Sequence, residues 1–324
     1  YLSGSVTCNS GTTIMGDVIL GAGALAITSG CTINGDLSAS SVVSIQSGEV
    51  TGNVNSASVQ SGISVSLSNS AIVDSNIFAA GPVSVNGKVG GNIVAGPSVG
   101  TSTFSSQSSV GGSVISAGAV SASAGVIKGT ISMNQSGIIT PTIPLVPGWV
   151  DYAYSASDWQ TSDGASYAVL TMMACDATTL ANSLITIENS LTPIILDTRV
   201  CGSNTNFGGY NLTLTSDTVI IANGFSLSSN DIESASTSEK RLWIIIPDTV
   251  VDGQPTCSAN SYAKIVNHVT VGPHIGVMIY SPCLISNAGD VWRGQMYASS
   301  VSSNSSFTLN FLPIGLPTVN LSTG

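Results

Sequence analysis

The 324-residue chain is long enough for two domains with sizeable cores. Only 7% of its residues are charged, against roughly 25% in an average soluble domain. The net charge is −10 with seven basic residues, which argues against binding to nucleic acid or anionic lipid through a basic patch. Hydrophobic residues make up 43% and alternate with small polar ones, unlike the pattern of a disordered chain.

A short motif recurs through the first 130 residues. In "IMGDV" and "INGDL", a Gly is followed by a polar and then an apolar residue, and an apolar residue stands two places before it. The central residues of seven such motifs are spaced by 19, 17, 23, 16, 21 and 17 residues. They are Gly16, Gly35, Gly52, Ser75, Gly91, Gly112 and Gly129.

This repeat predicts a β-solenoid (β-helix) of about seven coils over residues 1–140. Alternation at period two indicates strands with one buried face, and a repeat of this length holds three short strands. Such strands cannot bury their apolar faces alone, so each coil must stack on its neighbours. We expect Gly at the corner to supply a φ that other residues resist, although Ser75 shows that not every corner requires it.

The repeat is expected to end near residue 140. Pro141, Pro144 and Pro147 follow within seven residues, and they cannot continue a hydrogen-bonded ladder. Residues 141–148 are therefore predicted to form a Pro-rich seam between two domains.

Residues 149–324 have a different composition, with thirteen of the seventeen acidic residues and all four tryptophans. A strand is expected over 167–174, followed by a short helix for which Asp176 is a plausible N-cap. The rest is strand-like, and continuously apolar runs such as "WIIIP" and "GVMIY" indicate strands covered on both faces. The preferred prediction for this β-rich domain is a second, irregular solenoid, and a β-sandwich is the alternative.

Six cysteines permit fifteen pairings. The even count and the uncharged surface suggest an oxidising, extracellular setting. Consecutive cysteines are separated by 23, 26 and 26 residues, close to one to one and a half repeats. We therefore predict three local disulfides: Cys8–Cys31, Cys175–Cys201 and Cys257–Cys283.

Two further features bear on localisation. The chain begins at Tyr1 without a signal peptide or an 18-residue apolar run, so we expect a mature soluble portion whose membrane anchor, if it has one, lies upstream. Four N-x-[ST] sequons are compatible with a secreted, glycosylated chain. They begin at Asn134, Asn211, Asn304 and Asn320.

The chain resembles two kinds of bacterial protein. The "TIxGDV"-like corners resemble bactofilin-type polymer-forming solenoids. Together with "GWVDYAYSASDW", "HVTVGPHIGVMIYSPC", "WRGQMYASS" and "FLPIGLP", they resemble actinobacterial pilin-like (PilX-type) surface proteins, in which a hydrophobic helix precedes a solenoid and a β-rich domain. The resemblance implies a structural or adhesive role and supplies no catalytic residues.

One pair of acidic residues could carry enzyme chemistry. Asp17 and Asp36 occupy equivalent positions in successive coils and should stack roughly 5 Å apart, a spacing that suits a retaining pair of carboxylates on a glycosidase. The alternative, which we favour, is that both are solvated corner residues, because Asn53, Asn76 and Asn92 take the same place in later coils.

The two histidines are candidates for a metal site. His268 and His274 flank "VTVGP" and would need a third ligand such as Asp290 or Asp248. The favoured interpretation is two polar residues near a turn. The sequence has no Ser-His-Asp order and no G-x-S-x-G elbow to support a hydrolase.

The aromatic and acidic segment after residue 148 is the most distinctive local feature. Its rings could stack on sugars, or they could cap the open end of the solenoid and seal the domain seam, which we favour. These candidate glycan-binding or cap residues are Trp149, Tyr152, Tyr154 and Trp159. Asp158 and Asp163 are candidate Ca²⁺ ligands, and no other cofactor is expected.

The sequence therefore predicts a non-enzymatic extracellular or cell-surface protein, type IV pilus-associated or filament-forming, with adhesive or structural function. Its expected partners are other protein subunits, in homo- or hetero-assembly, or surface glycans. The alternatives are a secreted β-helix enzyme acting on polysaccharide and a module that binds glycan or ice.

Overall fold

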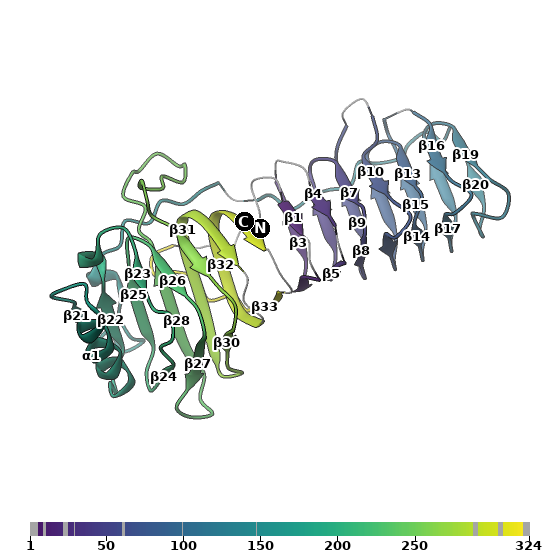
Figure 1. Cartoon of the computed structure of the whole chain (residues 1–324). Coiled ribbons are helices and arrows are strands. Elements are labelled where there is room, and N and C mark those ends of the chain that lie inside the picture. The colour runs from purple at the N-terminus through teal and green to yellow at the C-terminus, as the bar shows by residue number, and fades with distance from the viewer. Residues whose placement is uncertain are drawn as a thin grey trace. The chain divides into compact units, whose positions relative to one another are not determined.

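The computed structural model describes residues 6–8, 11–21, 25–28, 30–59, 62–98, 100–146, 148–287, 291–303 and 307–319. The chain divides into two compact units, residues 1–147 and 148–323, and strands make up most of the regular structure of each (Figure 1).

The first unit is a β-solenoid made of three parallel sheets. The first sheet contains β1 (Val6–Cys8), β4 (Leu25–Ile27), β7 (Val43–Ile45), β10 (Val65–Leu67), β13 (Val83–Val85), β16 (Ser102–Phe104) and β19 (Val120–Ala122). The second contains β2 (Thr13–Met15), β5 (Cys31–Asn34), β8 (Gly48–Val50), β11 (Ile72–Val73), β14 (Lys88–Val89) and β17 (Ser109–Val110). The third contains β3 (Val18–Leu20), β6 (Leu37–Ala39), β9 (Val54–Ser56), β12 (Ile77–Ala79), β15 (Ile93–Ala95), β18 (Val114–Ser116) and β20 (Ile131–Ser132).

Register places like side chains above one another in these sheets. Val65 pairs with Val43 and Val83, and all three are fully buried. The middle residue of most strands points outward and is at least partly exposed. The alternation in the sequence therefore produces the expected continuous core of stacked Val, Ile and Leu.

A ladder of polar side chains runs along one corner of the first unit. Each side chain accepts a hydrogen bond from the backbone N–H of the equivalent residue in the next coil, at 2.7 to 3.3 Å. The acceptors of this corner ladder are Asp17, Asp36, Asn53, Asn76, Asn92 and Ser113, and the last donor is Thr130.

The expected reason for the corner glycines is wrong for most of them. Gly16 has a φ of +133°, but the later corner glycines do not lie in the left-handed region. A Cβ on Gly35 would lie 2.5 Å from the carbonyl oxygen of Gly16 in the preceding coil. Glycine is needed there because the coils stack too closely for a side chain.

The Pro-rich segment packs back along the first unit. A Cβ on Gly21, in an early coil, would meet Val146 of this segment at 2.9 Å, and just before the segment Ile138 lies 3.3 Å from where a Cβ on Gly96 would be. The segment predicted as a seam thus also covers part of the solenoid surface.

The second unit is also a solenoid, because its strands pair in parallel, whereas a sandwich has antiparallel sheets. One sheet runs through β21 (Ala168–Thr171), β22 (Ile194–Asp197), β25 (Thr218–Ile221), β28 (Lys240–Ile245), β31 (Ile275–Asn287), β32 (Val291–Ser303) and β33 (Thr308–Phe311). The others contain β23 (Thr205–Asn206), β26 (Phe225–Leu227) and β29 (Ala263–Ile265), and β24 (Leu212–Leu214), β27 (Asn230–Ser234) and β30 (Val269–Val271). The alternative of a sandwich is therefore wrong.

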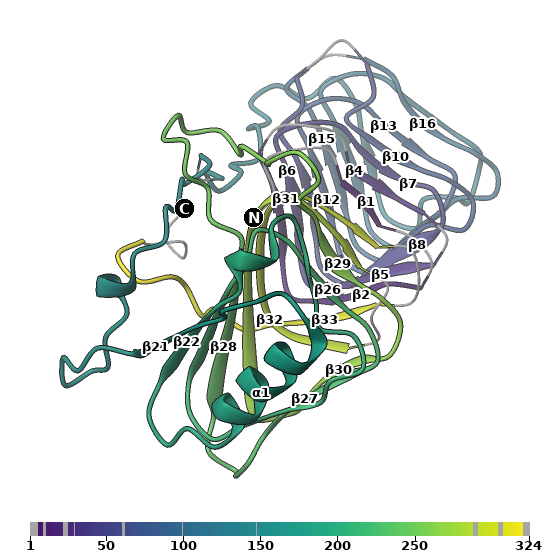
Figure 2. The same cartoon turned by 60° about the vertical axis from the view of Figure 1, so that its left-hand side comes forward.

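Helix α1 (Ala177–Glu188) covers one end of the second unit (Figure 2). Asp176 is its N-cap as predicted, and its carboxylate accepts from the Thr179 N–H at 2.9 Å. Leu184 and Ile187 of the helix join the core cluster with Leu196 and Leu214, members of early coils. Short 3-10 turns occur at Ala156–Asp158 and Arg199–Cys201.

All three predicted disulfides are confirmed. Cys8–Cys31, Cys175–Cys201 and Cys257–Cys283 are bonded, and no cysteine is free.

Candidate functional site

One flank of the second unit is apolar on its outward side and is covered by residues 149–167, which we call the flank strap. Strap residues Tyr152, Trp159 and Tyr167 pack on the outward side chains of four neighbouring strands. Those outward side chains are Ile195, Val219, Ile221, Trp243, Ile245, Met278 and Tyr280. The strap thus explains why "WIIIP" and "GVMIY" are apolar on both faces.

Two tyrosines fix the backbone of the strap to the flank. The Val150 N–H donates to the Tyr297 hydroxyl at 3.0 Å, and the Tyr152 N–H donates to the Tyr280 hydroxyl at 3.0 Å. The Tyr280 hydroxyl in turn donates to the Val150 carbonyl at 2.7 Å. Burial, followed by the nearby Asp248 carboxylate, raises the pKa of Tyr280, so it remains a neutral donor.

Aspartates connect the strap to the long loop 247–262. The buried Asp248 carboxylate accepts from Trp149 Nε1 at 2.8 Å and from the Thr256 N–H at 3.0 Å. The Asp248 N–H donates to the Tyr152 carbonyl at 3.0 Å. Asp151 accepts from the Gly253 N–H at 2.8 Å. Strap and loop therefore hold each other in one conformation.

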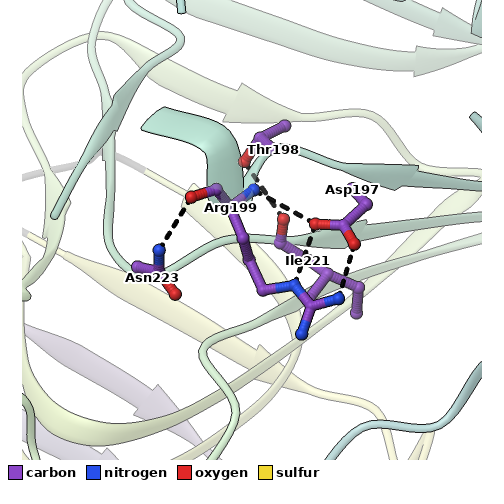
Figure 3. Close-up of polar contacts among 5 residues, drawn as sticks. All are labelled: Asp197, Thr198, Arg199, Ile221 and Asn223. Atoms are coloured by element: carbon purple, nitrogen blue, oxygen red, sulfur yellow. Dashed lines mark hydrogen bonds and ion pairs between the residues drawn. The ribbon is translucent and has the colours of Figure 1, made fainter. Parts of the chain in front are cut away.

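Arg199 contacts strap residue Tyr154 and also forms hydrogen bonds with Asp197 and Asn223. Figure 3 shows these hydrogen bonds. Its guanidinium binds Asp197 through Nε at 2.9 Å and Nη2 at 2.6 Å, and its carbonyl accepts from Asn223. The guanidinium carbon lies 5.3 Å from the centroid of the Tyr154 ring. Burial alone would raise the pKa of Asp197, but the hydrogen bonds from Arg199 lower it below its usual value.

Two of the four aromatic candidates have no exposed ring face. Tyr152 and Trp159 are only 4% and 1% exposed, so their ring faces are covered by protein. Both residues cover a flank of the second solenoid, and α1 covers one end of it. Trp149 instead stacks on Tyr297, with ring centroids 4.9 Å apart.

The predicted Ca²⁺ ligands are not brought into a site. The Thr161 hydroxyl binds the Asp163 carboxylate, and Asp158 lies in a separate 3-10 turn. Within the described ranges, no group of three or more His, Cys, Asp or Glu side chains could hold a metal ion. His268 and His274 belong to no such group, and Asp290 lies outside the described residues.

The carboxylates of Asp17 and Asp36 act in the corner ladder. Asp17 Oδ1 accepts from the Asp36 N–H at 2.8 Å, and Asp36 Oδ1 accepts from the Asn53 N–H at 2.7 Å. The favoured structural interpretation of the pair fits this geometry, because one oxygen of each is engaged with the next coil.

Two of the predicted sequons can be placed. Asn134 and Asn211 are exposed, and Asn211 Oδ1 accepts from the Asp231 N–H at 3.1 Å. Asn304 and Asn320 lie outside the described residues.

The sequence reasoning missed the anchors of the strap. Arg199, Tyr280 and Tyr297 were not singled out, and Asp248 was named only as a metal ligand. The available signal was the apolar run "GVMIY", which requires a covering layer but does not identify it.

No family model, curated protein or solved structure matches the chain. In the part of the chain that the structure describes, no helix is both long and apolar enough to cross a membrane.

Proposed function

We propose that this chain is a non-enzymatic structural protein of the extracellular surface, associated with a pilus or another surface filament. It acts mechanically: stacked coils form a stiff support, and the second solenoid is presented to other subunits or to surface glycans.

The corner ladder is the observation that carries this proposal. Side-chain hydrogen bonds of 2.7 to 3.3 Å join each pair of successive coils from Asp17 to Thr130, in addition to the parallel backbone ladders. A force that separates two coils must break both kinds of bond together. The polar positions of the repeat are thus used for cohesion between coils.

The disulfides support an extracellular location. Three bonds within one chain are consistent with an oxidising environment and close loops of 23 and 26 residues. They restrict local opening under load or protease attack.

Immunogold electron microscopy of intact source cells tests the proposal. Antibody against residues 1–324 should label filaments or their tips, and pre-immune serum is the control. Label spread over the wall, or found only in the medium, would overturn the filament association.

One observation favours a second candidate, a module that binds ice or a crystalline glycan. Register aligns a file of outward residues on the first sheet, six of which carry hydroxyls. They are Thr7, Ala26, Ser44, Ser66, Ser84, Thr103 and Ser121. Adsorption to ice and to crystalline polysaccharide tests this candidate, and S66Y/S84Y should abolish it. Adsorption that survives these substitutions would exclude this surface.

A further inference from the structure

The flank strap, residues 149–167, lies at the point where the chain enters the second unit. It directly follows the Pro-rich segment, whose Val146 lies close to Gly21 of the first unit. Tension that passes along the backbone from the first unit to the second therefore acts on the strap before it acts on any coil of the second solenoid.

The strap is attached differently from the coils that it covers. Strands β22, β25 and β28 are each paired with a parallel strand on both edges. Residues 149–167 contain no strand, and separate hydrogen bonds join their backbone to the flank, such as those from the Val150 and Tyr152 N–H groups to two tyrosine hydroxyls. Tension at residue 148 loads these bonds one after another, whereas separating two coils loads a whole ladder at once.

The strap is also separate from the inner core of the second solenoid. Its rings pack on the outward side chains of the flank. The inner core cluster, which includes Leu196, Leu214 and Ile244, contains no residue of the strap among those that the structure describes. Detachment of the strap would therefore leave the inner core and the parallel ladders in place, and it would uncover the outward apolar side chains of the flank.

The disulfide Cys175–Cys201 limits how far the chain can detach. It closes a loop that contains both α1 and β22. Tension that reaches Cys175 passes across the bond to Cys201, so it leaves these two elements folded. Only the strap and the short segment with β21 lie between the first unit and this bond.

The disulfide Cys257–Cys283 holds the partner of the strap in place. Cys257 belongs to the loop 247–262, which binds the strap through Asp248 and Gly253, and Cys283 belongs to β31. The loop therefore stays attached to the solenoid when the strap leaves it.

We propose that the strap is a cover that tension removes reversibly: it detaches from the flank under load, uncovers the outward apolar side chains, and binds again when the load falls. The inference rests on the proposed function, because a subunit of a surface filament carries load along its chain. It adds to that function an apolar surface that exists only under load.

The C-terminal part of the second unit covers the same flank. Ile314 and Leu316 belong to the same cluster as the strap, and the Gly315 carbonyl accepts from Trp243 Nε1 at 2.8 Å. This segment, residues 312–319, is shorter than the strap. A pull on both ends of the chain should therefore give two detachment steps of different length.

Force spectroscopy on residues 1–324, held by tags at both ends, tests the proposal. A stretched chain spans about 3.3–3.6 Å per residue, so release of the nineteen strap residues should lengthen it by up to about 65 Å. Release of the eight residues 312–319 should add up to about 28 Å in a separate step. Both steps should occur at lower force than the opening of any coil of the second solenoid, and both should reverse as the force falls.

Tyrosine variants identify the longer step. Y280F/Y297F removes the two hydroxyls that bind the strap backbone but keeps both rings, so it should lower the force of this step and leave its length unchanged. Y210F is the matched control in the same unit. The Tyr210 hydroxyl donates to the carbonyl of Ala177 in α1, at 3.4 Å, and its loss should not change the step.

Opening of the second unit in one larger step, with no earlier step of the strap's length, would overturn the proposal. A step that does not reverse would also overturn it, as would a force that Y280F/Y297F leaves unchanged or that Y210F lowers equally. The proposed function fails separately, through immunogold label away from filaments, because the detachment is measured on the isolated chain.

Discussion

The two solenoids of this chain differ in the outer faces of their coils and in the contacts that stabilise them. In the first, strands of two to four residues turn small polar side chains outward, and the corner ladder joins successive coils. In the second, strands of up to thirteen residues carry apolar side chains on both faces, so one flank needs a covering strap. The first is stabilised by contacts that repeat from coil to coil, whereas the second also depends on contacts between segments far apart in sequence.

Removing the side chain of Trp159 should destabilise the second solenoid more than the other substitutions described below. This fully covered residue packs edge-on against Trp243 with ring centroids 5.0 Å apart. W159A should lower the free energy of unfolding of the second unit by about 3–5 kcal/mol. Denaturant titration followed by tryptophan fluorescence measures this unit alone, because all four tryptophans lie in it.

Phe104→Ala is the control in the first unit, since Phe104 is 4% exposed there. It should leave the tryptophan transition in place. If it shifts that transition as far as W159A does, the two units unfold as one and the comparison between them fails.

The disulfide beside α1 should have the next largest effect. Cys175 and Cys201 are 26 residues apart, and removing such a cross-link costs about 3 kcal/mol in the chain-entropy model. C175S/C201S should therefore move the tryptophan transition to lower denaturant. C8S/C31S opens a loop of similar length in the first unit and should not move it; a shift in both would show coupling between the units.

Close stacking at the corner of the first solenoid predicts a smaller effect. A Cβ on Gly35 would press on the Gly16 carbonyl, and overpacking of this kind costs about 1–3 kcal/mol. G35A should lower the midpoint of thermal unfolding measured by far-ultraviolet circular dichroism. Gly148 has open space for a Cβ, so G148A should be neutral; an equally neutral G35A would contradict the packing explanation.

How far the sequence predicts this molecule depends on whether the determining contacts are periodic. The coils of the first unit follow from motifs such as those at Gly16 and Gly35, because a repeated pattern has a single stacking solution. The Cys8–Cys31 bond and the Asp176 N-cap also follow, since spacing and local chemistry determine them.

The flank strap could not be predicted in the same way. Trp149 forms a hydrogen bond with Asp248, 99 residues away, and Tyr152 forms one with Tyr280, 128 residues away. No repeat in the sequence identifies these partners. The aromatic composition of the strap indicated sugar binding or an end cap, of which the cap was favoured, and it gave no indication of a flank cover. Only the outward apolar residues of β28 and β31 indicate such a cover, because they require a layer of protein on that side.

The anchor between Asp197 and Arg199 should give the smallest effect, and it depends on pH. Hydrogen bonds from Arg199 outweigh burial and lower the pKa of Asp197 in the folded state. Its stabilisation is therefore full above the unfolded value of about 3.9 and is lost as pH falls through the lower folded value.

Because the guanidinium is 42% exposed, solvent screening limits this contribution to less than about 1 kcal/mol. D197N should thus lower the free energy of unfolding slightly at about pH 7, and the difference from wild type should shrink at an acidic pH well below the unfolded value of about 3.9. Tryptophan fluorescence titrations at the two pH values measure it. A difference that persists in acid would mean that Asp197 acts through packing rather than through its charge.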